Sequence, residues 1–149
     1  MKNDRSDPNY VGPGVWVSIH IESSSARNKQ SQESFCANVR EICDKFPCLN
    51  CSEHCKSYIK NNPPEKFIGI KMLIDGKYEE IGVSIWSWTF HNSVNLRLGK
   101  PCLDWDTYQG MYIKTEKVCS EKCSLSNFSP QNKKIKNKMP TIPNNLLKM

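Results

Sequence analysis

The stretch that most constrains this chain is a proline followed at once by a Cys-x-x-Cys motif. Pro47 precedes Cys48, and Cys51 lies three residues further on. This arrangement is typical of a redox dithiol at the start of a helix, where free backbone N–H groups and the positive end of the helix dipole stabilise a thiolate. We therefore predict that Cys48 is the outer, reactive sulfur. Cys51 is expected one helical turn further in, facing a buried partner supplied by another part of the chain.

The cysteine content agrees with a redox or metal-binding function. The chain has 149 residues and eight cysteines. That number is too small for a miniature disulfide scaffold and large for a reduced cytosolic protein. The length suits a single domain with its own core.

Apolar residues at helical spacing predict an all-α fold, a four-helix bundle plus a short fifth helix. Proline and glycine positions, together with a capping aspartate, set the expected ends. The expected helices run from about Pro13 to the mid twenties, from the polar connection 28–31 to Pro47, from Pro47 to Asn61, from about Val83 to Leu98, and from Asp104 to Ile113.

Residues 65–82 break the helical pattern. Two short runs with strand character flank Asp75 and Gly76, a pair typical of a tight hairpin turn. We predict a small β-hairpin or long loop inserted between the third and fourth helices.

The chain divides into a polar lead (1–11), a domain (12–115) and a basic tail (116–149). Five of the six net positive charges lie in the tail, where seven lysines accompany two glutamates. Such a composition predicts a solvated, disordered segment. No nucleic-acid contact is expected, because no basic motif interleaved with aromatic residues is present. The lead lacks the apolar core of a signal peptide, and no run of about 20 apolar residues follows. We expect a protein that is neither secreted nor membrane-spanning.

The fourth predicted helix places polar side chains among apolar ones. His91, Asn95 and Leu98 share a face with Val94, and the first helix adds Trp16 and His20 one turn apart. Such a mixture suits a bound planar heterocycle whose orientation is fixed by a few polar groups.

Three blocks of sequence together resemble one family. They are Gly12-x-x-x-Trp16-x-x-x-His20, then Cys48-x-x-Cys51, then His91-Asn92-x-Val94-Asn95-x-x-Leu98-Gly99-Lys100-Pro101. In this order they resemble the Erv/ALR family of FAD-linked sulfhydryl oxidases. Cys51-x-x-His54 and Tyr58 are most similar to the compact members encoded by large cytoplasmic DNA viruses. The resemblance implies a helical bundle that holds FAD with the Cys48–Cys51 disulfide against its isoalloxazine ring.

The resemblance also implies roles for individual residues. Trp16 and His20 would pack on the flavin, and Tyr112 falls where the family has an aromatic residue near the cofactor. The full set of implied cofactor-binding residues is Gly12, Trp16, His20, His91, Asn92, Val94, Asn95, Leu98, Lys100 and Tyr112. Cys48 and Cys51 would oxidise a protein dithiol or a thioredoxin-like relay carrier. The electrons would pass to FAD and then to molecular oxygen, which gives hydrogen peroxide.

The implied setting is the cytoplasm of an infected host cell, its viral assembly site and the virion. Family members are usually homodimers through the first two helices. The apolar stripe of Phe35 and Val39 is compatible with such an interface.

The sequence departs from the cellular members at a structural disulfide between the fourth and fifth helices. Its two positions fall here on Trp88 and Trp105, and an aromatic pair is expected to replace the bridge by packing.

The remaining cysteines leave several alternatives open. Cys119 and Cys123 are either a shuttle pair that passes electrons to Cys48–Cys51 or two unpaired surface thiols. Cys36 and Cys43 are expected to be small buried apolar residues. Cys55 and Cys102 receive no role.

A different class of function uses the same cysteines. Cys48, Cys51 and either His54 or Cys55 could join Cys119 and Cys123 in a structural zinc site, which would make the chain an interaction module without enzymatic activity. The first three ligands would lie within one helix and could not surround the ion alone. This reading also leaves the block that begins at His91 unexplained.

Overall fold

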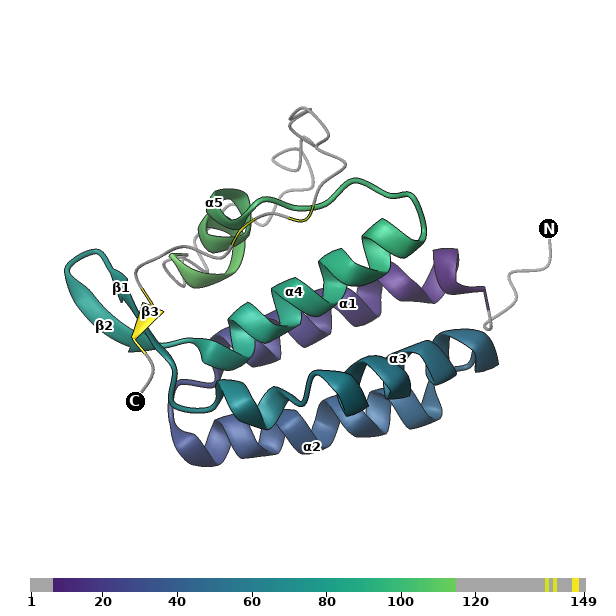
Figure 1. The fold of residues 1–149 in the computed structure, drawn as a ribbon, viewed down its shortest axis with the longest axis horizontal. Helices are drawn as coiled ribbons and strands as arrows, with labels where there is room; N and C mark the ends of the chain where they lie inside the picture. Colours follow the sequence, from purple (N-terminus) through teal and green to yellow (C-terminus); the bar gives the residue numbers. More distant parts are fainter. Residues whose placement is uncertain (1–6, 115–138, 140, 142–145, 148–149) are drawn as a thin grey trace, which may run out of the picture.

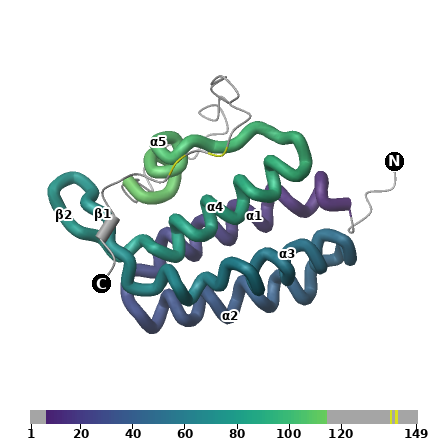
Figure 2. Tube along the Cα trace, in the orientation of Figure 1, coloured from purple at the N-terminus to yellow at the C-terminus, as the bar shows by residue number. Residues whose placement is uncertain are grey.

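Helices dominate the computed structural model, which describes residues 7–114, 139, 141 and 146–147. The helices are α1 (Pro8–Ser25), α2 (Lys29–Lys45), α3 (Leu49–Asn61), α4 (Gly82–Arg97) and α5 (Trp105–Tyr108), with a 3-10 turn, η1 (Pro64–Phe67), and a π-helical turn, η2 (Gln109–Ile113). Strands are β1 (Lys71–Ile74), β2 (Lys77–Glu80) and β3 (Leu146–Leu147). α1 lies along α4, and α2 lies along α3 (Figures 1 and 2). The predicted four-helix bundle with a short fifth helix is confirmed.

α1 begins earlier than the sequence predicted. The side chain of Asp7 accepts a hydrogen bond from the backbone N–H of Asn9 at 2.9 Å, and Pro8 occupies the first helical position. Aspartate is a favourable cap, and proline is tolerated there because its missing N–H would have no partner. The expected start at Pro13 was wrong, because this exposed proline lies inside the helix rather than at its beginning.

α2 also starts earlier, within the stretch expected to be a connection. The Asn28 side chain accepts from the N–H of Ser31 at 2.9 Å, while the Ser31 hydroxyl accepts from the N–H of Asn28 at 3.3 Å. This reciprocal capping box explains why a polar run forms the first turn of a helix.

The predicted hairpin is confirmed between α3 and α4. β1 pairs antiparallel with β2, and Asp75 and Gly76 connect them with φ of 48° and 81°. Two consecutive positive φ values are characteristic of a type I′ turn, which matches the twist of a two-residue hairpin. β3 pairs antiparallel with the other edge of β1, so the strand order is β2-β1-β3.

The hairpin contributes to one of two hydrophobic clusters. The first fills the space between the four long helices and includes Phe35, Val39 and Trp86. The second comprises Met72, Ile74, Ile81, Ile85, Trp88, Trp105 and Tyr108, and lies between the hairpin, α4 and α5. Residues 65–82 therefore do more than extend a loop, because three of their apolar side chains, Met72, Ile74 and Ile81, are buried against the bundle.

Two expectations about apolar residues have opposite outcomes. Phe35 and Val39 are each 1% exposed, so the idea that they form a dimer interface was wrong: the monomer already buries them. Trp88 and Trp105 do meet, edge to face with ring centroids 5.2 Å apart. The predicted aromatic contact between α4 and α5 is confirmed.

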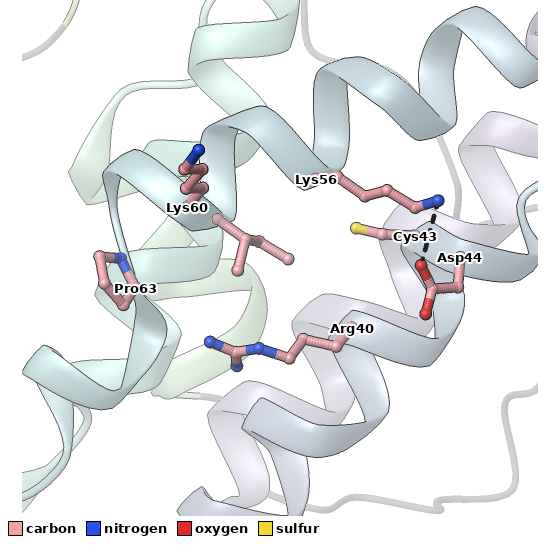
Figure 3. A pocket seen from close by; sticks show the side chains of 7 residues that line it. Arg40, Cys43, Asp44, Lys56, Lys60 and Pro63 are labelled. Carbon is pink, nitrogen blue, oxygen red and sulfur yellow. Dashed lines mark ion pairs between the residues drawn. The ribbon is translucent and has the colours of Figure 1, made fainter.

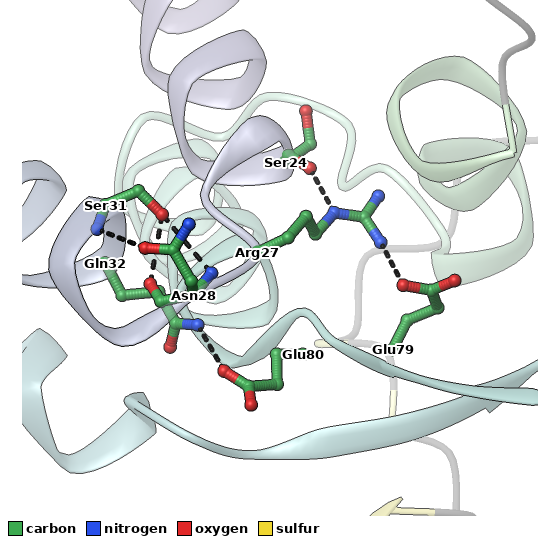
Figure 4. A network of polar contacts seen from close by, with 7 residues as sticks. All are labelled: Ser24, Arg27, Asn28, Ser31, Gln32, Glu79 and Glu80. Atoms are coloured by element: carbon green, nitrogen blue, oxygen red, sulfur yellow. Dashed lines mark hydrogen bonds and ion pairs between the residues drawn. The ribbon is translucent and has the colours of Figure 1, made fainter.

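A polar network joins the start of α2 to the hairpin (Figure 4). The fully buried Gln32 donates to Glu80 at 3.0 Å and accepts from the backbone N–H of Gly69 at 3.0 Å. Arg27 donates to the carbonyl of Ser24 at 2.6 Å and lies 3.4 Å from Glu79. Gln32 thus positions both ends of the inserted segment.

We expect Gln32→Ala to lower the free energy of unfolding by about 1–3 kcal/mol, because it removes a buried side chain and leaves the partly buried N–H of Gly69 without its acceptor. Urea unfolding monitored by circular dichroism measures this change. Gln30→Ala is the matched control, since the same residue type on the same helix is exposed there. Equal effects of the two substitutions would contradict the role assigned to Gln32.

Within the described residues, no helix combines the length and apolar character needed to cross a bilayer.

Candidate functional site

The Cys-x-x-Cys motif forms a disulfide at the start of α3. Cys48 is the N-cap residue, and its Cα lies 5.2 Å from that of Cys51. The backbone N–H of Cys51 donates to Sγ of Cys48 at 3.2 Å. Both cysteines are partly exposed, and Leu49 between them is 75% exposed. The predicted helix-start geometry is confirmed, and the helix end can stabilise negative charge on Cys48.

Three of the predicted cofactor residues form one stack between α1 and α4. The rings of Trp16 and His91 are nearly parallel, with centroids 4.1 Å apart and an interplanar angle of 5°. His20 stacks beside both, at 5.9 Å from Trp16 and 5.1 Å from His91. Tyr112 reaches the same group, with its ring centroid 5.0 Å from that of His20.

Hydrogen bonds extend this stack into the protein. Nε2 of His20 lies 2.8 Å from Nδ1 of His91, so one imidazole donates to the other. Nδ1 of His20 lies 3.2 Å from the Ser87 hydroxyl. That hydroxyl contacts Ser23 at 2.8 Å and the hydroxyl of Tyr108 at 3.1 Å. Both imidazoles, the buried His20 and the partly buried His91, therefore belong to a continuous network of polar groups.

Both histidines are held neutral. Burial, and secondarily the neighbouring His91, lowers the pKa of His20 from 6.5 to about 3. Burial, and secondarily the positive charge of Lys100, lowers the pKa of His91 to about 4. A neutral pair can share one N–H between two ring nitrogens, whereas two imidazolium rings in contact would repel each other.

These lowered pKa values predict a loss of stability in mild acid. Between pH 7 and pH 5 the unfolded chain binds protons at His20 and His91 that the folded chain does not, so unfolding becomes easier by about 1–2 kcal/mol for each histidine. Urea unfolding at the two pH values measures the effect. The variant H20Q/H91Q should show a weaker pH dependence, whereas H54Q, at an exposed position of α3, should retain that of the unmodified chain. The same pH dependence in H20Q/H91Q would contradict this prediction.

The other predicted cofactor residues on α4 lie near its C-terminal end. The amide of Asn92 donates to the carbonyl of Leu103 at 2.8 Å and accepts from its N–H at 2.9 Å, which fixes the segment before α5. Asn95 is buried, and Val94 packs against the first cluster. Leu98 and Lys100 are exposed just beyond the helix.

An aromatic path connects the redox helix to the histidine stack. Tyr58 of α3 stacks on Phe90 of α4 at 4.7 Å, and Phe90 meets Trp16 edge to face at 5.0 Å. Sequence reasoning noted Tyr58 only as part of a resemblance and gave Phe90 no role. Ser84, Ser87 and His91 follow one another at intervals of three and four residues and so share one face of α4. This spacing could also have indicated the polar network.

The chemistry of this region fits a flavin nucleotide. The parallel rings of Trp16 and His91 offer flat apolar faces, and Lys100 supplies positive charge for phosphate groups. A Cβ added at Gly12, one turn before Trp16, would meet nothing within 4 Å. The space next to Gly12 is therefore open. Two cavities elsewhere among the described residues, of about 350 and 320 Å³, are lined by other side chains.

One prediction about the remaining cysteines was wrong. Cys43 is buried as expected, but it forms a disulfide with Cys55 instead of serving as a small apolar residue. Cys36 is a free buried thiol, as expected, and burial raises its pKa to about 11. Cys102 is a free, partly buried thiol whose Sγ lies 3.7 Å from the carbonyl oxygen of Asn92.

The zinc reading finds no support in the described part of the chain. Cys48, Cys51 and Cys55 are all in disulfides and have no thiolate to offer a metal. No group of three or more potential ligands gathers among residues 7–114. Cys119 and Cys123, the predicted shuttle pair, lie outside the described residues.

Comparison with known proteins identifies relatives of the same architecture. The model of the Erv1/Alr family matches residues 13–115. An FAD-linked sulfhydryl oxidase of African swine fever virus is 28% identical over 106 residues, which span 69% of this chain and 80% of that protein. The "Putative FAD-linked sulfhydryl oxidase 347L" of Invertebrate iridescent virus 6 is 32% identical over 105 residues, or 65% of this chain and 86% of that protein.

Solved structures show the same fold at lower sequence identity. The yeast Erv1 core superposes with a TM-score of 0.58 at 21% identity, covering 75% of this chain and 88% of that one. The FAD binding domain of Erv1 from Saccharomyces cerevisiae gives a TM-score of 0.55 at 20% identity, covering 75% and 94%. With the family match over most of the described residues, these similarities lead to one conclusion: the chain belongs to the Erv1/Alr family.

Proposed function

We propose that this chain is an FAD-linked sulfhydryl oxidase that forms disulfide bonds in protein substrates. The observation that carries the proposal is the Cys48–Cys51 disulfide at a helix start, in the same bundle as an aromatic and histidine stack suited to a flavin. Relatives of this chain bear the name FAD-linked sulfhydryl oxidase.

The exposed end of α3 suits a protein dithiol as substrate. Leu49 projects between the two cysteines and is 75% exposed. An apolar side chain at this position can contact an extended client segment or the surface of a thioredoxin-like relay carrier. Cys48 and Cys51 are both accessible enough for thiol–disulfide exchange.

The exchange proceeds in two steps. A substrate thiolate attacks Sγ of Cys48, the Cys48–Cys51 bond breaks, and Cys51 leaves as a thiolate. The second substrate thiolate then attacks the first substrate sulfur, and Cys48 leaves. The N–H of Cys51, 3.2 Å from Sγ of Cys48, stabilises the departing Cys48 thiolate and so makes it a better leaving group. The substrate gains a disulfide, and the protein gains a Cys48/Cys51 dithiol.

The remaining site residues hold the cofactor. Trp16 and His20 bind the flavin ring, with Tyr112 beside them, and Gly12 leaves room next to Trp16. His91, Asn92, Val94, Asn95, Leu98 and Lys100 hold the adenosine and phosphate part, and Asn92 also positions the segment at Leu103. Bound FAD supplies the two-electron chemistry that returns the dithiol to a disulfide and gives hydrogen peroxide from molecular oxygen.

A homodimer through α1 is part of the proposal. Tyr10, Val17 and Ile21 lie seven and four residues apart on one face of α1 and are 60%, 46% and 54% exposed. These three side chains offer an exposed apolar surface, whereas Phe35 and Val39 are buried within the monomer. A compartment that is otherwise reducing, such as the cytoplasm of an infected cell, is where such an oxidase would be needed.

The visible absorption spectrum of the purified chain tests this proposal. A flavin band that bleaches when a dithiol is added without air, and returns with oxygen, is the expected result. A colourless protein that consumes no oxygen with dithiothreitol would overturn the proposal.

A further inference from the structure

The redox disulfide Cys48–Cys51 lies within the stretch of sequence that a second disulfide encloses. Cys43 in the last turns of α2 is bonded to Cys55 of α3, with Cα atoms 5.6 Å apart, and both Cys48 and Cys51 fall between them in sequence. Ser52, which is 3% exposed, adds a hydrogen bond across the same corner by donating to the carbonyl of Cys43 at 2.5 Å. The Cys43–Cys55 bridge therefore fixes the two helices on either side of the redox pair. We call it the staple.

Access to the staple is restricted. Cys43 is 1% exposed, and Cys55 is partly buried against the first hydrophobic cluster. Figure 3 shows the Cys43 side chain at the wall of a cavity between α2 and α3, with Arg40, Lys56 and Lys60 around it. Two of these cations are already paired, Arg40 with Glu65 and Lys56 with Asp44. The Cys43 sulfur is therefore poorly accessible to a protein oxidant in the folded chain.

An oxidant of the same chain lies next to the staple. Cys51 and Cys55 are four residues apart on α3, a spacing that puts two Cβ atoms about 5–6 Å apart on one helix face. A disulfide needs Cβ atoms about 3.5–4.5 Å apart, so a small opening of the first turns of α3 brings a Cys55 thiolate onto Sγ of Cys51. Cys43 lies beside Cys55, because the two are bonded in the folded chain.

We propose that the Cys48–Cys51 disulfide oxidises Cys43 and Cys55 of its own chain, so that the protein closes its own staple. The inference rests on the proposed function, which supplies the oxidised redox pair. Its substrate is the dithiol of Cys43 and Cys55 before the bridge exists.

The exchange balances without a further reagent. The Cys55 thiolate attacks Sγ of Cys51, the Cys48–Cys51 bond breaks, and Cys48 leaves as a thiolate at the start of α3. The Cys43 thiolate then attacks Sγ of Cys55, and the Cys51–Cys55 bond breaks. Two electrons have moved to the redox pair, and the two protons lost by Cys43 and Cys55 are taken up by Cys48 and Cys51. The resulting Cys48/Cys51 dithiol is then reoxidised in the same way as after the oxidation of a protein substrate.

The first experiment compares thiols in chains made in a reducing cytosol. The unmodified chain, C48S/C51S and C102S are each expressed alone, quenched in acid, alkylated and mapped by mass spectrometry. The Cys43–Cys55 bridge should be complete in the unmodified chain and in the C102S control, and lost in C48S/C51S. A complete bridge in C48S/C51S would overturn the inference, because another oxidant would then suffice.

A second measurement does not depend on the folding of a variant. The unmodified holoprotein is reduced without air, freed of reductant and exposed to oxygen, and closure of the staple is followed over time. The rate constant should not change over a tenfold range of protein concentration. A rate constant that rises with concentration would overturn closure within one chain.

Oxygen uptake with dithiothreitol separates this inference from the proposed function. An unmodified chain that takes up no oxygen refutes the function itself. An active chain whose staple closes in C48S/C51S refutes the self-oxidation alone. The variant C43A/C55A should keep its oxygen uptake but melt at a lower temperature. If C43A/C55A loses oxygen uptake while its flavin is still bound, Cys43 and Cys55 are needed to pass electrons during turnover. That result would overturn the purely structural role of the staple.

Discussion

Cys51→Ser is expected to abolish oxygen uptake with dithiothreitol while leaving the flavin bound. The substitution removes the sulfur that closes the Cys48–Cys51 disulfide, so no two-electron acceptor remains at the start of α3. Cofactor retention should be unaffected, because the stack of Trp16, His20 and His91 is built from α1 and α4. An oxygen electrode and the ratio of flavin to protein absorbance measure the two quantities.

Cys102→Ser is the control for this loss. Cys102 is a free thiol outside both disulfides, and its replacement should leave turnover unchanged. Full turnover in C51S would refute the mechanism. Loss of flavin together with activity would show instead that Cys51 supports cofactor binding.

Trp88→Ala is expected to give the largest loss of stability, about 3–5 kcal/mol, as for other buried tryptophans cut back to alanine. Trp88 is 1% exposed, meets Trp105 edge to face, and donates from Nε1 to the carbonyl of Leu103 at 2.8 Å. All three contributions disappear together in the variant. Chemical denaturation followed by tryptophan fluorescence and circular dichroism gives the free energy of unfolding.

A pair of further variants tests the source of this loss. Tyr78→Ala removes an aromatic ring that is 55% exposed on β2 and should change stability by less than about 0.5 kcal/mol. The double variant W88A/W105A should lose less than the sum of the single losses, because the two rings stabilise each other. Strict additivity would contradict a stabilising Trp88–Trp105 contact.

The sequence predicted elements whose signals are local. Asp75 and Gly76 define their turn through backbone conformation alone, and Asp104 caps α5 by accepting from the N–H of Thr107 at 2.8 Å. The start of α1 was misplaced because Gly12, Pro13 and Gly14 look like a break. In the fold, the cap at Asp7 outweighs them.

The sequence indicates candidate site residues where chemistry and spacing coincide, but it does not reveal contacts between residues far apart in the chain. Trp16, His20 and His91 were expected around one cofactor, but the direct hydrogen bond between the two imidazoles requires the packing of α1 on α4. The partner of Cys43 could not be deduced, since eight cysteines permit many pairings. The contact between Tyr58 and Phe90 could not be deduced either, because it exists only once α3 and α4 pack together.

The pairing of β3 with β1 bears on how this protein avoids aggregation through its strand edges. A hairpin that stands alone offers two unpaired strand edges, and such edges recruit other chains into growing sheets. Here Leu146–Leu147 occupies the edge of β1, and only β2 is left open among the described strands. β2 consists of Lys77, Tyr78, Glu79 and Glu80, and charged side chains on an edge discourage a second strand from adding to it. Removing the last few residues of the chain should therefore make it more prone to aggregate at high concentration, even if its redox chemistry is intact.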